Sequence, residues 1–147
     1  MTPTTTDRLR LDVLDHDECV QLLEQAKIGR VAVHSGALPA IFPVNFLLTS
    51  AGIVFRTNRG TKLAAATEGA VVAFEVDHAD PMYHEGWSVL VVGRAQEITE
   101  ASELEAASAL PLRSWASTEA DHYVRISMHL VSGRRIRTAG PRAAEHA

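Results

Sequence analysis

Apolar residues recur at helical spacing near the start of the chain. They are Cys19, Leu22, Leu23 and Ala26. This spacing places all four on one face of a helix, which we expect to be buried. Asp15 stands at the N-cap position, Glu18 three residues later completes a capping box, and Gly29 is expected to end the helix.

A period of two follows and predicts β-strands. The expected strands are residues 30–34, 40–48, 53–55, 71–76, 87–98 and 121–131. Short turns at Ser35-Gly36-Ala37 and Ser50-Ala51-Gly52 favour antiparallel hairpins over a parallel sheet. Pro43 lies inside the second strand. Because proline has no N–H for a ladder, that strand should be at a sheet edge or bulged near this position.

The strand expected at 87–98 is apolar on both faces. Val89 and Val91 alternate with Leu90 and Val92. A strand of this kind should be covered on both sides. We expect a second copy of the chain to provide one of the covers, so the sequence predicts a homodimer.

Two further helices complete the predicted elements. One begins at Lys62 and ends before Gly69, and the other has Thr99 as its cap and runs to Leu110. Residues 77–85 read as a polar connection. The fold class predicted is α+β, with about six mainly antiparallel strands and three short helices, an arrangement compatible with a small closed barrel. Residues 1–13 should form a flexible arm, 14–136 one domain and 137–147 a flexible tail.

Composition narrows the function classes. A chain of 147 residues with a formal net charge of −4 lacks the basic footprint of a nucleic-acid-binding protein. Its single cysteine, Cys19, permits no internal disulfide and lies on the apolar helix face, where a buried hydrophobe is favoured over a nucleophile. The chain shows no signal-peptide pattern and no apolar run long enough to span a membrane, so we expect a cytoplasmic protein without a membrane partner.

Metal and hydrolase chemistry find little support in the sequence. The seven histidines are scattered, and no H-E-x-x-H or G-x-S-x-G motif is present. His78 and His84 share a segment with Asp77 and Asp80, where a solvated loop is favoured over a metal site. We expect no metal and no catalytic side chain. A cofactor would then supply the chemistry of any reaction.

One stretch has the residues of an anion site. After the strand at 53–55, a polar turn carries Arg56, Thr57, Asn58, Arg59, Gly60 and Thr61, and Lys62 opens a helix. Hydroxyl groups, cations and unpaired N–H groups at such a turn favour a phosphate. A strand-to-helix turn also needs cap and bend residues without any ligand, so this interpretation stands beside a purely structural one. The rings of Trp87 and Trp115 likewise suit either packing or the walls of a planar ligand.

Several segments, taken in order, resemble the pyridoxamine 5′-phosphate oxidase-like family. The resemblance covers roughly residues 14–136 and is nearest to small actinobacterial-type split-barrel flavin proteins, close to the nitroimidazole-reductase branch. The segments that carry it are Ile28-Gly29-Arg30-Val31-Ala32-Val33, Pro39-Ala40-Ile41-Phe42-Pro43-Val44-Asn45-Phe46, Ile53-Val54-Phe55-Arg56-Thr57, Gly60-Thr61-Lys62-Leu63, Gly86-Trp87-Ser88-Val89 and Gly93-Arg94-Ala95.

This resemblance implies a homodimeric split β-barrel that binds FMN, or in some relatives a deazaflavin coenzyme, at the subunit interface. Motif position implies which side chains contact the cofactor. They are Arg56, Thr57, Asn58, Thr61 and Lys62 around the phosphate, Pro43, Val44 and Asn45 along the ring, and Trp87, Ser88, Arg113 and Trp115 from the other subunit.

The activity implied is an FMN-dependent oxidoreductase that acts on a small molecule by two-electron transfer. The alternatives are a deazaflavin-dependent reductase and a non-catalytic flavin- or haem-binding protein. One departure concerns the substrate. Pyridoxamine phosphate oxidases end in an Arg-x-His-type segment, whereas this chain has Gly133-Arg134-Arg135-Ile136-Arg137 without a histidine. Pyridoxamine phosphate is therefore not the expected substrate.

Overall fold

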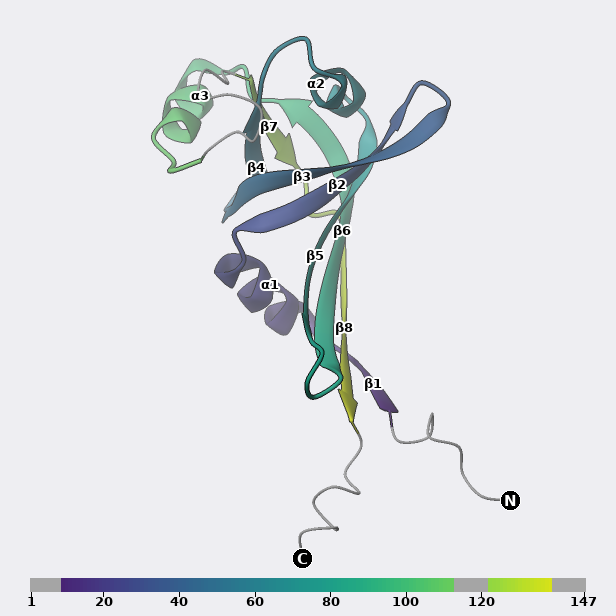
Figure 1. The fold of residues 1–147 in the computed structure, drawn as a ribbon. Helices are drawn as coiled ribbons and strands as arrows, with labels where there is room; N and C mark the ends of the chain where they lie inside the picture. Colours follow the sequence, from purple (N-terminus) through teal and green to yellow (C-terminus); the bar gives the residue numbers. More distant parts are fainter. Residues whose placement is uncertain (1–8, 113–121, 139–147) are drawn as a thin grey trace, which may run out of the picture.

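The computed structural model describes residues 9–112 and 122–138 of the chain (Figure 1). Within them the chain forms eight strands and three helices. In order they are β1 (Leu9–Val13), α1 (His16–Gln25), β2 (Ile28–Ser35), β3 (Leu38–Thr49), β4 (Gly52–Thr57), α2 (Lys62–Thr67), β5 (Val71–Asp80), β6 (Glu85–Glu97), α3 (Ala101–Ser108), β7 (His122–Ile126) and β8 (Leu130–Thr138).

Six of the strands close into an antiparallel barrel. Their order is β6-β5-β2-β3-β4-β7, and β7 pairs back onto β6. The long strand β6 is shared between two neighbours on one edge, because residues Gly86–Val92 pair with β8 and residues Ala95–Glu97 pair with β7. Strand β1 adds to the outer edge of β8. The predicted α+β split barrel is therefore confirmed, with two strands beyond the ring of six.

The edge of β6 is split where the chain crosses over Gly93. A Cβ atom at Gly93 would lie 1.6 Å from the carbonyl oxygen of Ser127, so only glycine permits this approach. The Arg94 N–H donates to Ser127 Oγ, and the Ser127 N–H donates to the Arg94 carbonyl oxygen, both at 3.1 Å. The single strand predicted at 121–131 is consequently two strands, β7 and β8. Leu130, at the start of β8, is 60% exposed.

The barrel core is filled by aromatic and β-branched side chains. The rings of Phe46 and Phe74 meet edge to face, with centroids 4.8 Å apart and an interplanar angle of 71°. The ring of Phe74 also occupies the space beside Gly29, where a Cβ would lie 2.2 Å from its Cζ. Gly29 was expected to end the first helix. It lies instead in β2, where close packing of this ring requires a residue without a side chain.

The predicted start of α1 is confirmed. The Glu18 N–H donates to Asp15 Oδ1 at 2.8 Å, and the Asp15 N–H donates to Glu18 Oε1 at 3.4 Å, which is the predicted capping box. Cys19 and Leu23 are buried on the face that packs against the sheet. The helix ends at Gln25, because Ala26 already has extended backbone angles.

Three other boundaries differ from the sequence-based expectation. Residues 9–13, expected in a loose arm, form β1, because pairing with β8 satisfies their backbone and Asp12 forms an ion pair with Arg137 at 2.6 Å. Residues 77–80 and 85, expected in a connection, lengthen the β5–β6 hairpin through continued pairing. Helix α3 has Glu100 rather than Thr99 at its N-cap and ends at Ser108. Residues 1–8 and 139–147, expected to be flexible, lie outside the described residues.

One face of the sheet carries exposed apolar side chains, and we name it the open face. Cross-strand pairing places Leu90 beside Ser132, Val92 beside Leu130, and Val13 in line with Arg134 and Ser88 on this same side. Its exposed apolar members are Leu11, Val13, Ile41, Leu90, Leu130 and Ile136. Helix α1 packs on the opposite face, so the expected second cover of β6 stays a prediction.

The helices offer no route across a bilayer. Of the helices within residues 9–112 and 122–138, none is long and apolar enough to span a bilayer.

Candidate functional site

The loop between β4 and α2 is held in shape by two threonine hydroxyl groups. Thr61 caps α2, with its Oγ1 accepting from the Ala64 N–H at 3.0 Å, and the same hydroxyl donates to the Asn58 carbonyl oxygen at 2.9 Å. The Thr57 and Thr61 hydroxyl oxygens lie 3.3 Å apart. We call residues 57–62 the β4–α2 loop; Figure 1 shows it at the end of the barrel that α2 covers.

This loop has room for a ligand and polar groups to meet it. Gly60 has a φ of +76°, and no heavy atom lies within 4 Å of where its Cβ would be. Asn58 Oδ1 is buried and accepts no hydrogen bond from the described residues. The side chains of Arg59 and Lys62 are exposed beside these groups. Two cations and the Thr57 hydroxyl group suit an anionic group with several oxygen atoms. The Thr61 proton is already donated to the Asn58 carbonyl oxygen, and the Asn58 amide oxygen can only accept, so neither group donates to an anion.

The side chain of Arg56 contacts groups outside the β4–α2 loop. Its Nη1 donates to the Leu112 carbonyl oxygen at 3.1 Å, and its guanidinium lies 5.6 Å from the centre of the Tyr123 ring. These contacts tie β4 to β7 and to the segment that follows α3. A direct role for Arg56 at a bound phosphate stays a prediction.

The strands β3 and β4 separate beside this loop. Their pairing stops at Phe46 and Phe55, after which β3 pairs only with β2, while β4 continues beside β7. Pro43 therefore lies on a part of β3 that no described strand pairs on its second side, which confirms the edge position predicted for it. The pairing with β2 continues without a bulge. Val44 is buried, whereas Pro43 is exposed and Asn45 half-buried.

Two acid–base residues that sequence analysis did not connect meet below the loop. Glu97 ends β6 and His122 begins β7, and His122 Nδ1 lies 3.3 Å from Glu97 Oε2. The same oxygen forms an ion pair with Arg59 Nη2 at 3.0 Å. The register that pairs His122 with Thr57 brings this histidine to the base of the loop. Only strand pairing joins residues so far apart in the chain, so no local sequence pattern could have indicated this group.

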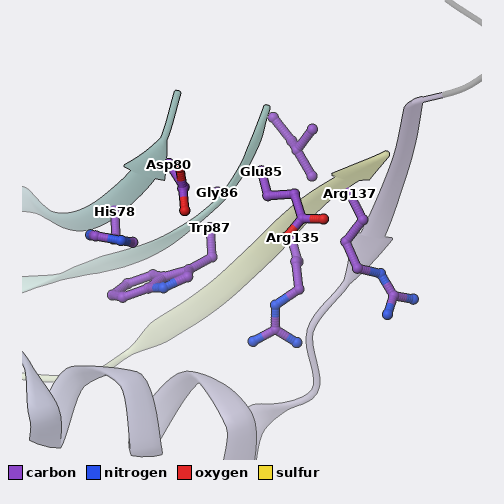
Figure 2. A pocket seen from close by; sticks show the side chains of 8 residues that line it. His78, Asp80, Glu85, Gly86, Trp87, Arg135 and Arg137 are labelled. Atoms are coloured by element: carbon purple, nitrogen blue, oxygen red, sulfur yellow. The ribbon is translucent and has the colours of Figure 1, made fainter. Parts of the chain in front are cut away.

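A pocket of about 220 Å³ lies at the other end of β6 (Figure 2). Trp87 and His78 lie side by side on neighbouring strands, with ring centroids 6.4 Å apart, and Arg135 and Arg137 of β8 project toward the α1 side. Both arginines form ion pairs, Arg135 with Glu18 at 3.5 Å and Arg137 with Asp12 at 2.6 Å. The lining residues are His78, Asp80, Glu85, Gly86, Trp87, Arg135, Ile136 and Arg137.

The predicted contacts at Trp87 and Ser88 do not join the β4–α2 loop within one chain. From Trp87 to Glu97, whose carboxylate contacts the loop, β6 extends about 33 Å at ~3.3 Å per residue. The two residues also point to opposite faces of the strand: Trp87 lines the pocket on the α1 side, and Ser88 lies on the open face. Arg113 and Trp115 lie outside the described residues.

Among the described residues, Glu75 and Cys19 have shifted pKa values. Burial raises the pKa of Glu75 to about 7, with a further rise from the hydrogen bond and charge of Asp77, while Arg30 opposes the shift from 3.3 Å. Burial also raises the pKa of the Cys19 thiol, to which the Asp15 and Glu18 carboxylates add. Cys19 is buried at 1% exposure, which agrees with the structural role predicted for it.

Histidine and acidic side chains do not assemble into a metal site in the part of the chain that the structure describes. No group of three or more potential ligands meets there. His78 lies beside Trp87, and His84 occupies the β5–β6 turn with a φ of +54°.

The chain is similar to one protein family along most of its length. Residues 15–135 match the family model described as pyridoxamine 5′-phosphate oxidase. An uncharacterized protein of Mycobacterium tuberculosis, Rv0080, is 38% identical over 128 residues, which is 84% of each chain.

Two solved structures share the fold. The FAD binding protein from Mycobacterium smegmatis has a TM-score of 0.72 and 34% identity, over 85% of this chain and 97% of that one. A FAD-binding protein from Mesorhizobium loti has a TM-score of 0.68 and 22% identity, over 85% of this chain and 97% of that one, a likeness that concerns the fold alone.

The raised pKa of Glu75 predicts a pH-dependent stability. Since its folded-state pKa near 7 exceeds the ordinary value of 4.5, protonation favours the folded state. This contribution is fully present below pH 4.5 and is lost as the pH rises through about 7. Thermal unfolding followed by circular dichroism should show wild type losing more stability over this range than Glu75→Gln. A parallel decline in the two proteins would contradict the shift. Glu24→Gln, an equal charge change on exposed α1, serves as the control.

Proposed function

Because this chain belongs to the pyridoxamine 5′-phosphate oxidase family, we propose that it is a flavin-binding oxidoreductase that acts on a small molecule. The observation that carries the proposal is the β4–α2 loop, which offers an anion two exposed cations and the Thr57 hydroxyl group. The relative from Mycobacterium smegmatis, 34% identical over 97% of its own length, is described as a FAD binding protein. FMN is the cofactor that we propose for this chain.

The phosphate of the flavin would lie in the β4–α2 loop. Thr57 and Lys62 would donate to its oxygens, and Arg59 would add a second positive charge. The loop already holds its shape through the contacts of Thr61 with Asn58 and Ala64, so little ordering is needed when the ligand binds. Residues Pro43–Asn45, on the part of β3 that no described strand pairs on its second side, would border the ring.

A bound flavin supplies two-electron transfer between a donor and a small oxidant. The protein's part is to bind and orient the flavin and to limit the access of water to it. The β4–α2 loop fixes the phosphate end, and buried Val44 gives the adjacent part of β3 an apolar side. We assign no proton transfer to a side chain of this chain.

We further propose that two copies of the chain form the working unit. Ser88, expected at the flavin, is separated from the loop of its own chain by nearly the whole length of β6. A second copy packed on the open face could bring its own Ser88 to that loop. The same face exposes Leu11, Val13 and Leu130 at 57%, 80% and 60%, and burial of these side chains would favour association. Pro43 and Ser88 lie on this face by strand register.

The first test is a titration with FMN followed by quenching of flavin fluorescence. Wild type should bind with a Kd that inorganic phosphate raises by competition. Lys62→Ala should bind more than tenfold more weakly, because a charge-assisted hydrogen bond of ~1.5–3 kcal/mol is lost. Lys27→Ala is the matched control, since Lys27 is the other lysine of the chain, is exposed and lies outside the loop, at the residue before β2.

Equal FMN affinities for folded Lys62→Ala and Lys27→Ala would exclude the loop as the phosphate site. Parallel titrations with FAD, a deazaflavin coenzyme and haem identify the preferred cofactor. Of these three, FAD is titrated first, because the similar Mycobacterium smegmatis protein is described as binding it. Turnover with reduced nicotinamide as the donor then separates an oxidoreductase from a protein that only binds flavin.

The dimer has its own test in Leu130→Glu. A charge among the exposed apolar side chains of the open face should convert a dimer of about 32 kDa, twice the 15.9 kDa chain, into monomers, as measured by light scattering. FMN affinity should fall with it, since each site would lose the neighbouring copy. Leu38→Glu is the control, because Leu38 is 73% exposed near the β2–β3 turn and points away from the open face. A Leu130→Glu dimer with unchanged FMN affinity would refute this arrangement.

A further inference from the structure

One carboxylate oxygen below the β4–α2 loop faces two donors. Glu97 Oε2 forms an ion pair with Arg59 Nη2 at 3.0 Å and lies 3.3 Å from His122 Nδ1. Glu97 is 21% exposed, the side chain of Arg59 is 60% exposed and that of His122 only 9%. Arg59, the exposed donor, is therefore the one that can move away from Glu97. His122, the buried donor, stays beside the carboxylate.

The buried donor has no hydrogen bond while Arg59 holds the carboxylate. His122 Nδ1 is buried and is not satisfied by any residue in the described parts of the chain, although Glu97 Oε2 is within reach. A buried N–H without an acceptor is unfavourable. If Arg59 moved away, a small rotation of the imidazole, in the tautomer that carries its proton on Nδ1, would let it donate to Glu97. The departure of Arg59 would then leave neither Glu97 nor His122 unsatisfied.

We propose that Arg59 is an exchangeable arginine, which Glu97 holds in the free protein and which turns to the anionic group of a ligand when the loop is filled. His122 then takes the place of Arg59 on the Glu97 carboxylate. The inference rests on the proposed anion site of the β4–α2 loop. It adds that Glu97 competes with the ligand for Arg59 and so lowers the affinity of the loop for phosphate.

The position of Arg59 supports this exchange. It lies between Asn58, whose Oδ1 is buried without a hydrogen bond, and Gly60, whose surroundings are open. The space beside Gly60 lies on the way from Glu97 to the loop and would accommodate the guanidinium as it turns. Strand pairing holds Glu97 and His122 in place, since Glu97 pairs with Val124 and His122 with Thr57.

The test compares FMN affinity, and separately inorganic phosphate affinity, across a set of variants. Glu97→Gln should bind both ligands about two- to fivefold more tightly at low salt, the size of effect expected from removal of a competing, partly exposed ion pair. Glu24→Gln, which makes the same charge change on α1, should leave both affinities within about 1.5-fold of wild type. Arg59→Met should weaken both ligands.

A double variant separates exchange from the loss of a negative charge. In Arg59→Met/Glu97→Gln, the gain from Glu97→Gln should disappear, because no arginine remains to be released. If the gain persists, Glu97 acts through bulk electrostatics and the exchange is wrong. If Glu97→Gln weakens binding in the wild-type background, Glu97 positions Arg59 for the ligand and the exchange is equally wrong.

A direct readout does not depend on affinity. The ¹⁵N chemical shift of His122 Nδ1, assigned with a His122→Gln variant, should move toward that of a hydrogen-bonded N–H when phosphate is added to wild type. It should not move in Arg59→Met. An unchanged His122 signal in phosphate-saturated wild type would overturn the exchange while leaving the anion site intact. A wild-type protein that binds neither FMN nor phosphate would overturn the proposed function together with this inference.

Discussion

The close approach of Gly93 and Ser127 decides how the rest of this molecule is built. The two backbones cross at a distance that no side chain at position 93 would permit, and the Arg94 and Ser127 groups exchange hydrogen bonds there. On one side of this crossing β6 belongs to the closed barrel, and on the other side it belongs to an open sheet with β8 and β1. The barrel end carries the β4–α2 loop, and the sheet end carries the Trp87 pocket and the open face.

This division separates the polar groups proposed for one ligand by the length of a strand. Phe46, Phe74 and other buried side chains fill the core of the barrel in the described residues, so the proposed flavin would lie on its surface. The loop supplies positive charge and a hydroxyl group, but its exposed residues would leave a bound ligand open to solvent. An exposed apolar sheet face in the same chain could supply cover only to another copy. The proposed dimer therefore follows from the same split in β6 that positions the loop.

Local patterns predicted what is locally determined, and strand register determined the rest. The Asp15–Glu18 capping box, the edge position of Pro43 and the hairpin turns depend on neighbouring residues, and they were predicted. The two-strand nature of 121–138 depends on contact with Gly93, more than 30 residues away, and β1 depends on pairing with the far end of the chain. The loop residues were found because they are contiguous. Glu97 and His122 were missed because only the β6–β7 and β4–β7 pairings bring them to Arg59.

The central claim is that the β4–α2 loop of one chain and the open face of another together bind one flavin. A crystal structure of the protein grown with FMN tests it most directly. The phosphate should lie within hydrogen-bonding distance of Thr57 and Lys62, with the ring between Pro43–Asn45 of that chain and Ser88 of a second copy. An FMN molecule held within a single chain, or with its phosphate on Arg135 and Arg137 in the Trp87 pocket, would contradict it.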